Sequence, residues 1–212
     1  EVTDDKGKLF SMGAVPGKTY VVIWTTTTWT LPANVAICLG PNFDYALLKA
    51  NREGETEYYV VAKELAANVM QEAGIEEYEI IGTVKGSELE YVECAHPFLD
   101  RKSILILGDH VTLDSGTGCV HTAPGHGMDD FMVVTQHYPE IPFTVPVDSE
   151  GRMTEEAGFS AGLTTDEASK VIAKHIHESG HLLATKKLRH QYPHCWRCKE
   201  PILFRATEQW FC

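Results

Sequence analysis

Residues 20–39 read YVVIWTTTTWTLPANVAICL, in which two apolar runs flank a threonine-rich segment. The runs YVVIW and VAICL are short and rich in β-branched or aromatic residues, as strands are. Threonine is itself β-branched and suits a strand, but Pro32, Ala33 and Asn34 break the pattern. Several hydroxyl groups and one amide therefore gather at a predicted strand end, where either a binding site or a turn is expected.

Similar runs recur along the chain and indicate the fold class. They lie at 45–49, 57–62, 78–84, 104–107 and 118–122, and many are bounded by Gly, Pro, Asn or Asp. This spacing favours a barrel or sandwich over a parallel βαβ array. Helices are expected at 63–73, from about 127 to 138, and from a Thr164–Glu167 capping box up to Gly180. The sequence predicts a mainly β fold with peripheral helices, of the α+β class.

Length and composition are those of an ordinary globular domain. The 212 residues are 43% hydrophobic, which is enough for one core, and the net charge of −12 argues against a general attraction to nucleic acid or anionic membrane. Residues 170–205 reverse this balance with eight Lys or Arg and two Glu, so that segment is either a phosphate-facing surface or a solvated face. No apolar run reaches the roughly 18 residues of a membrane span, and no signal pattern is present, so a cytosolic location is expected.

The densest set of functional groups is HTAPGHGMDD, residues 121–130. Its Pro-Gly pair turns the backbone between two histidines, which places His121 at a strand end and Asp130 in the first turn of the following helix. In a structural interpretation, Asp129 and Asp130 only complement the helix N-terminus, an effect of about 0.3–1 kcal/mol. Alternatively, His121, His126 and one Asp supply the ligand types of zinc hydrolases, although the histidines do not have the i, i+4 spacing of a helical metal site.

A second motif, HCWRC at 194–198, places Cys195 and Cys198 at the spacing of half a four-ligand zinc site. The sequence holds no second C-x-x-C, so a closed centre needs ligands from other chain or from His190 or His194; two ordinary thiols in a turn are the alternative. The six cysteines are too sparse for a disulfide scaffold. The chain also lacks a G-x-S-x-G elbow, a P-loop and a G-x-G-x-x-G fingerprint, so water is the expected nucleophile of any hydrolysis.

Together, TTTTWTLPAN, GTGCVHTAPGHGMDD and HCWRCKEPILFRATEQWF resemble, in the same order, the editing domain inserted in isoleucyl-tRNA synthetases, which are class I enzymes. The resemblance spans the chain and implies a β-barrel core and a single editing domain over 1–212, with 1–18 and 186–212 as stem segments that join the synthetase body. Trp29 points to the isoleucyl branch, since related valyl and leucyl domains have Arg-Pro after their threonines. Thr28 departs from the family's usual Pro, which restores a backbone N–H and frees φ.

The resemblance implies hydrolytic proofreading: cleavage of the ester of Val-tRNA(Ile) while Ile-tRNA(Ile) is spared. The physical need is established for this very family, because a hydrophobic pocket gains only about 1–3 kcal/mol from one methylene and admits valine. A second, smaller pocket reverses that selection. The chain has neither the HIGH nor the KMSKS signature of the synthetic site, so it is expected to edit and not to activate.

By the same resemblance, Thr25, Thr26, Thr27 and Thr30 line the hydrolytic pocket and hold the terminal ribose and a water near the ester carbonyl. The other implied site residues have separate roles. Asn34 contacts the terminal nucleotide, His121 is the wall against the extra methylene of isoleucine, and Trp29 packs rather than stacks on the ligand. Asp130 pairs with the substrate's α-ammonium as an anchor, and not as a base, because a carboxylate at a helix start tends to have a low pKa.

No cofactor is expected to be required, and zinc at Cys195 and Cys198 is expected only with ligands from the synthetase body. The expected partners are the valine-carrying 3′ end of tRNA(Ile) and the rest of the synthetase in cis, with no membrane and a monomeric state. Two other classes stay open: a metal-dependent hydrolase that uses His121, His126 and Asp130, and a non-catalytic RNA-binding module that uses the basic segment 170–205.

Overall fold

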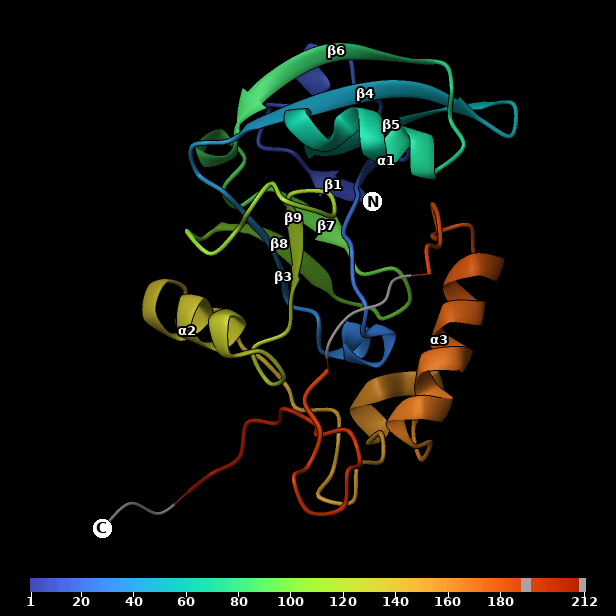
Figure 1. The fold of residues 1–212 in the computed structure, drawn as a ribbon. Helices are drawn as coiled ribbons and strands as arrows, with labels where there is room; N and C mark the ends of the chain where they lie inside the picture. The colour runs from blue at the N-terminus through green and yellow to red at the C-terminus, as the bar shows by residue number, and fades with distance from the viewer. Residues whose placement is uncertain (188–191, 210–212) are drawn as a thin grey trace.

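The computed structural model describes residues 1–187 and 192–209, in which two β-sheets are bordered by helices (Figure 1). The first sheet has the order β1 (Val2–Asp4), β7 (Glu93–Ala95), β8 (Lys102–Leu107), β3 (Ala36–Leu39) and β9 (Cys119–Thr122). The second has the order β2 (Thr19–Val21), β5 (Glu55–Ala62), β4 (Asp44–Arg52) and β6 (Tyr78–Lys85). Each of the seven predicted β runs overlaps a strand, and among the described residues the sequence missed only the three-residue strands β1 and β7.

The two sheets meet at one edge. Strand β3 pairs in parallel with β8 and antiparallel with β9, and a parallel bridge from Trp24 to Val120 joins the chain after β2 to β9. This isolated bridge links β9, at the edge of the first sheet, to the segment that follows β2 of the second sheet. The mainly β fold with peripheral helices is confirmed; the described strands pair as two joined sheets, without a ring of hydrogen-bonded strands that closes on itself.

The helices lie where the sequence predicts them. The 3-10 turn η3 (Lys63–Leu65) leads into α1 (Ala66–Glu72), and α2 (Met128–His137) and α3 (Thr165–Glu178) follow later in the chain. The predicted capping box of α3 is confirmed: the Glu167 N–H donates to Thr164 Oγ1, and the Glu167 carboxylate accepts from the Thr164 N–H at 2.9 Å. Further 3-10 helices are η1 (Phe10–Met12), η4 (Gly86–Glu88) and η5 (Glu155–Ser160).

The threonine-rich segment differs from its prediction as a strand end. Strand β2 stops at Val21, and residues Thr28–Ala33 form a 3-10 helix, η2. Its turns are closed locally, since the Thr30 hydroxyl donates to the Thr27 carbonyl at 2.8 Å and the Asn34 N–H donates to the Leu31 carbonyl. Threonine's β propensity is overridden here because side-chain and backbone hydrogen bonds support a tight helical turn.

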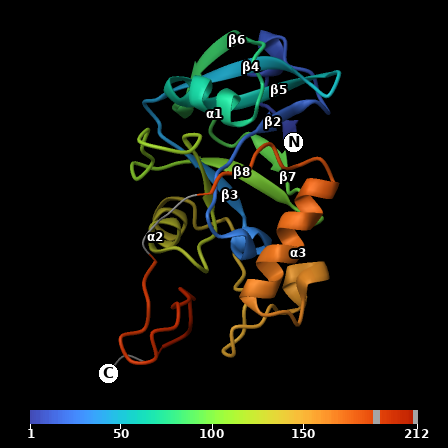
Figure 2. The same cartoon turned by 45° about the vertical axis from the view of Figure 1, so that its right-hand side comes forward.

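Helix α3 supports the threonine-rich segment from one side (Figure 2). Trp29 of η2 is buried in a cluster with Ala168 and Ile172 of α3. The Thr28 hydroxyl also donates to the Ser169 carbonyl at 3.1 Å, which is a second tie between this segment and α3. This packing fixes the segment that reaches the candidate site.

Residues 1–18 include β1 and the fully buried Leu9, and both pack on the main core. The assignment of 1–18 and 186–212 as stem segments stays a prediction. None of the helices in residues 1–187 and 192–209 is long and apolar enough to cross a membrane.

Candidate active site

A cavity of about 190 Å³ lies where η2, β9, the start of α2 and the C-terminal segment meet. Its walls come from parts of the chain that are far apart in sequence. They are Thr25, Thr27, Trp29, Thr30, His121, Ala123, His126, Asp130, Tyr192 and Phe204. The structure thus brings most of the sequence-predicted site residues into one enclosure, and it adds an unexpected wall from the C-terminal segment.

Three of the four predicted threonines line this cavity. Thr25 and Thr27 are partly buried and joined by a bond from the Thr27 N–H to Thr25 Oγ1 at 3.0 Å, while Thr30 is buried. Thr26 is exposed and lies outside the cavity wall, 3.4 Å from Thr27 between hydroxyl oxygens. The wall therefore offers hydroxyl groups, which donate or accept without adding charge.

His121 is held by a chain of hydrogen bonds. Asn34 Nδ2 donates both to the Ala36 carbonyl, at 2.9 Å, and to His121 Nδ1, at 2.8 Å. The ring must then carry its proton on Nε2, which donates to Thr30 Oγ1 at 3.0 Å, and the Thr30 hydroxyl in turn donates a hydrogen bond to the Thr27 carbonyl. Both ring nitrogens are used, so the ring can neither turn nor shift without loss of a bond.

The charge state of His121 follows from its burial. The side chain is 9% exposed, and desolvation lowers its pKa to about 3, with nearby His96, His126 and Arg101 acting in the same direction. At neutral pH the ring is an uncharged, rigid wall of the cavity. That is a suitable surface for exclusion by size.

Asn34 lies behind His121, whereas Trp29 packs as expected. Asn34 is 7% exposed, is not part of the cavity wall, and has its amide protons engaged by Ala36 and His121. It therefore orients His121, and the expected contact with a terminal nucleotide stays a prediction. Trp29 both packs in the α3 core and presents its ring to His126, with centroids 5.0 Å apart and planes at 78°.

Asp130 enters the cavity from the first turn of α2. Its Oδ2 accepts the Ala123 N–H at 2.8 Å, so the carboxylate ties the helix start back to the end of β9. The expectation of a low pKa was wrong: burial raises the pKa of Asp130 and outweighs the Ala123 bond and the nearby His110. A cation brought into the cavity would reverse this shift, because opposite charge favours the ionised form.

Gly127, the N-cap of α2, makes room for that carboxylate. An added Cβ at this position would lie 2.7 Å from Asp130 Oδ2, although the backbone φ of −132° suits any residue. We expect Gly127→Ala to displace the carboxylate and to lower site activity by about 10- to 100-fold, as misplacement of a reacting group by about 1 Å can do. The measurement is kcat/KM for ester hydrolysis beside Met128→Ala, an exposed neighbour; equal activities in the two variants would contradict it.

Tyr192 and Phe204 of the C-terminal segment are the part of the site that the sequence did not predict, whereas His126 was expected beside His121 and Asp130 only as an alternative metal ligand. His126 Nδ1 donates to the Phe204 carbonyl at 2.9 Å, and the Ala206 N–H donates to the Gly125 carbonyl at 2.8 Å. His126 and Phe204 are 78 positions apart in the sequence, and no local sequence pattern predicts their contact. The only available signal was the presence of His126 in the same motif as His121.

The alternative of a metal centre built from His121, His126 and Asp130 is not supported by the geometry. Both nitrogens of His121 are engaged, and in the described part of the chain no three His, Cys, Asp or Glu side chains are grouped so as to hold a metal. The motif therefore contributes one carboxylate and two imidazole rings to the cavity wall.

The C-x-x-C motif forms a tight turn away from the cavity wall. The Cys195 N–H donates to the Glu200 carbonyl, and the Lys199 N–H donates to the Cys195 carbonyl. Backbone N–H groups of Cys198 and Arg197 lower the pKa of the Cys195 thiol, which suits a metal-ligating thiolate. Cys198 is exposed, His194 bonds to the Tyr192 carbonyl, and His190 lies outside the described residues. Zinc at this turn, with ligands from outside this chain, stays a prediction.

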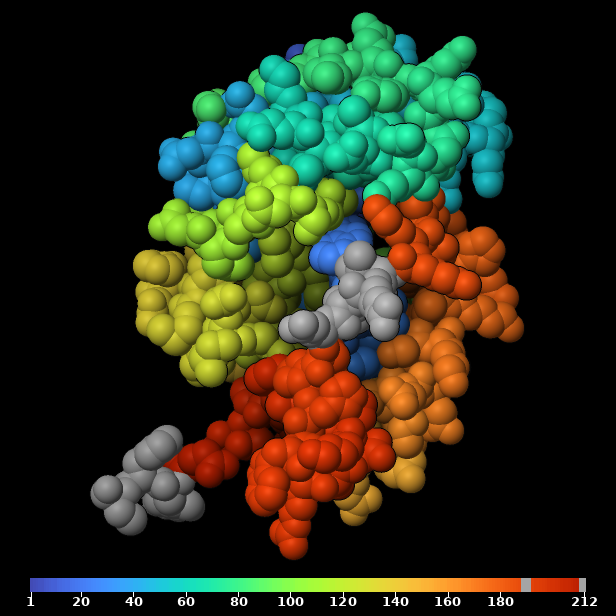
Figure 3. Space-filling view, viewed as in Figure 1, coloured from blue at the N-terminus to red at the C-terminus, as the bar shows by residue number. Residues whose placement is uncertain are grey.

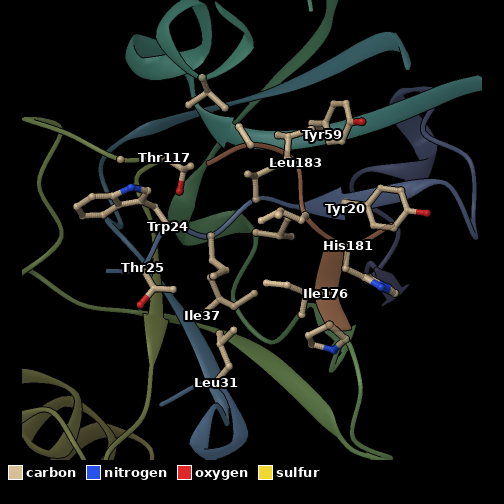
Figure 4. A pocket seen from close by; sticks show the side chains of 18 of the residues that line it. Tyr20, Trp24, Thr25, Leu31, Ile37, Tyr59, Thr117, Ile176, His181 and Leu183 are labelled. Carbon is tan, nitrogen blue, oxygen red and sulfur yellow. The ribbon is translucent and has the colours of Figure 1, made fainter. Parts of the chain in front are cut away.

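A larger, mainly apolar cavity of about 690 Å³ adjoins the first one and shares Thr25 with it. Figure 4 shows Trp24, Thr25 and Thr117 at one end and Tyr20, Tyr59 and His181 at the other. The segment after α3 borders it: Arg52 donates to the Gly180 and Leu182 carbonyls, and Lys186 pairs with Glu72 of α1 at 2.5 Å. Figure 3 shows this segment lying against α1.

Comparison with known proteins identifies similar sequences. The chain is 54% identical over 211 residues to the isoleucine--tRNA ligase of Caldicellulosiruptor saccharolyticus, covering all of this chain and 22% of the relative. It is 54% identical over 193 residues to that of Petrotoga mobilis, covering 91% of this chain and 20% of the relative. The chain thus spans about a fifth of the length of the curated relatives it matches. No family model matches it.

Solved structures share its fold. The GlLeuRS-CP1 structure aligns with a TM-score of 0.67 at 14% identity, covering 86% of this chain and 90% of that one. The editing domain of the cytosolic leucyl-tRNA synthetase of P. knowlesi aligns with a TM-score of 0.64 at 10% identity, covering 97% and 93%. At these identities the likeness establishes the fold, which is that of synthetase editing domains.

Proposed function

This chain corresponds over its whole length to one segment of the isoleucine--tRNA ligases and has the fold of a synthetase editing domain, and from that premise we propose that it hydrolyses misacylated tRNA. The proposed substrate is Val-tRNA(Ile), whose ester is cleaved while Ile-tRNA(Ile) is spared. The proposed setting is the cytoplasm, with the chain acting as a monomer beside the rest of the synthetase in cis.

One observation carries the proposal: a half-buried carboxylate, a row of hydroxyl groups and a neutral, immobilised imidazole face one cavity of about 190 Å³. An aminoacyl ester presents an ammonium group, an ester carbonyl and an apolar side chain. Asp130 complements the ammonium by charge, and Thr25, Thr27 and Thr30 complement the ester and ribose oxygens by hydrogen bonding. His121 complements the side chain by shape.

The chemistry asked of these residues is mainly positioning. The ammonium–carboxylate pair orients the ester, and the threonine hydroxyls hold its oxygens and a water molecule at the carbonyl carbon. Because His121 is hydrogen-bonded on both nitrogens, it cannot yield to a larger side chain without breaking a bond to Asn34 or Thr30. Rejection of isoleucine follows from that rigidity.

The direct test is deacylation of Val-tRNA(Ile) and Ile-tRNA(Ile) side by side by the full-length protein that contains this segment, without ATP. We expect release of valine and retention of isoleucine. Salt-sensitive tRNA binding with no release of either amino acid would contradict the proposal and favour a binding module.

Removal of metal is expected to leave this reaction intact. The proposed site holds an acid and two imidazoles that do not form a metal-ligand group, whereas the Cys195–Cys198 turn lies outside the cavity wall. We expect treatment with a chelator to remove any zinc from that turn while the rate of valine release changes by less than about twofold. Metal content by mass spectrometry checks the removal; activity that disappears with chelator and returns with zinc would contradict this expectation.

A further inference from the structure

One ring nitrogen of His126 is hydrogen-bonded, and the other has no hydrogen-bond partner among the described residues. Nδ1 is 2.9 Å from the Phe204 carbonyl oxygen, which can only accept, so Nδ1 must carry the proton. Nε2 of the neutral ring then carries no proton and can only accept a hydrogen bond. It is buried, and it has no hydrogen-bond partner among the described residues.

Such an arrangement is costly unless a donor arrives. A buried acceptor without a partner is destabilising, and His126 is only 9% exposed. His126 lines the same cavity as Asp130 and the three threonines, and the donor that we assign to Nε2 is a molecule held in that cavity. The nearly perpendicular Trp29 ring and the Phe204 bond hold the imidazole in place.

We propose that His126 is a catalytic residue whose Nε2 accepts the proton of the attacking water. This inference rests on the proposed editing function and deepens it. His121 cannot do this, because its Nδ1 and Nε2 are both engaged, and its Nε2 already carries a proton.

The step balances without any co-reactant. The water oxygen forms a bond to the ester carbonyl carbon while one water proton passes to His126 Nε2. The bond from that carbon to the ribose oxygen then breaks, and the same proton passes to the leaving ribose oxygen. The imidazolium that forms in between is supported by its Nδ1–H bond to Phe204, the group that also sets the tautomer.

The surroundings set the pH range in which this base works. Desolvation lowers the pKa of His126, the Phe204 carbonyl opposes that shift, and Arg205 of the C-terminal segment adds to it. The other titratable groups on the cavity wall are His121 on β9, which is neutral, Asp130 on α2, and Tyr192. Because the lowered pKa keeps Nε2 unprotonated at neutral pH, the rate should fall only as the pH drops into the acid range.

The test uses three variants of the full-length protein. His126→Asn keeps a donor for the Phe204 carbonyl but lacks Nε2; His126→Gln offers a hydrogen-bond acceptor but no base; His126→Phe keeps the ring against Trp29. We expect each to lower kcat for valine release by about 10²- to 10⁴-fold with KM within about threefold, and to lose the acid limb of the kcat–pH profile. His177→Asn, an exposed histidine of α3, is the control and should behave as wild type.

The outcomes separate this inference from the function on which it rests. A His126→Phe variant with kcat within about threefold of wild type and an unchanged acid limb would assign His126 to packing and overturn the proposal. Full activity of His126→Gln would show that His126 does not accept the proton of the attacking water. Its role would then be limited to a hydrogen bond. If the wild-type protein releases neither amino acid, the editing function itself fails, a result that does not depend on any variant.

Discussion

Asp130→Ala is expected to abolish the hydrolysis of Val-tRNA(Ile), with a fall in kcat/KM of about 10²- to 10³-fold. Asp130 is the one carboxylate on the wall of the cavity in the described residues, and it is the group that we assign to the substrate's ammonium. Removal of one partner of a buried charge pair costs about 3–5 kcal/mol, because the other charge is left uncompensated. The measurement is single-turnover release of valine from pre-charged tRNA.

Two variants separate charge from packing at this position. Asp129→Ala removes the exposed neighbouring acid and should keep wild-type activity. Asp130→Asn keeps an oxygen for the Ala123 N–H but loses the charge, and it should be as inactive as Asp130→Ala. Activity in the Asn variant would show that the charge is not needed.

The same substitution tests the raised pKa. Because burial raises the folded-state pKa of Asp130, its ionisation costs folding stability at any pH above that pKa and costs nothing at a pH below the unfolded value. Asp130→Asn should therefore leave Tm at neutral pH unchanged or higher while activity is lost. A stability–activity trade of this direction is typical of a functional carboxylate.

His121→Ala is expected to let the domain attack Ile-tRNA(Ile), while Val-tRNA(Ile) is still cleaved. The ring is the neutral, doubly hydrogen-bonded wall of the cavity, and its loss leaves space for one more methylene. Discrimination that rests on one methylene corresponds to about 10- to 200-fold, so the ratio of the two kcat/KM values should fall by that order. Both rates are measured on the same preparation.

His121→Leu is the matched control, because it keeps bulk at the wall without the hydrogen bonds. It should retain much of the discrimination if exclusion is by size. Both variants leave Asn34 and Thr30 without their ring partner, which lowers the free energy of unfolding by about 1–3 kcal/mol for each unsatisfied group. The assays are therefore run well below the lowered Tm. An unchanged valine-over-isoleucine ratio in His121→Ala would remove His121 from the specificity wall.

Much of the fold follows from local pattern. The apolar runs became strands, and α3 starts at its capping box because Thr164 and Glu167 satisfy each other's backbone groups. The sequence did not predict strands β1 and β7, because three residues are too few to show an alternation of apolar and polar side chains. The 3-10 helix η2 was missed because its hydrogen bonds, including that of Thr30 to the Thr27 carbonyl, compete with a strong β propensity.

The candidate site divides in the same way. By itself, the sequence determined which residue types gather between 121 and 130 and in the threonine segment, because motif order and turn chemistry are local properties. Only the tertiary structure decided that Asn34 orients His121, that the pKa of Asp130 is raised, and that Phe204 sets the tautomer of His126. The reason is physical: burial and hydrogen bonding between residues 78 or 87 positions apart depend on how the whole chain packs, and no window of sequence contains both partners.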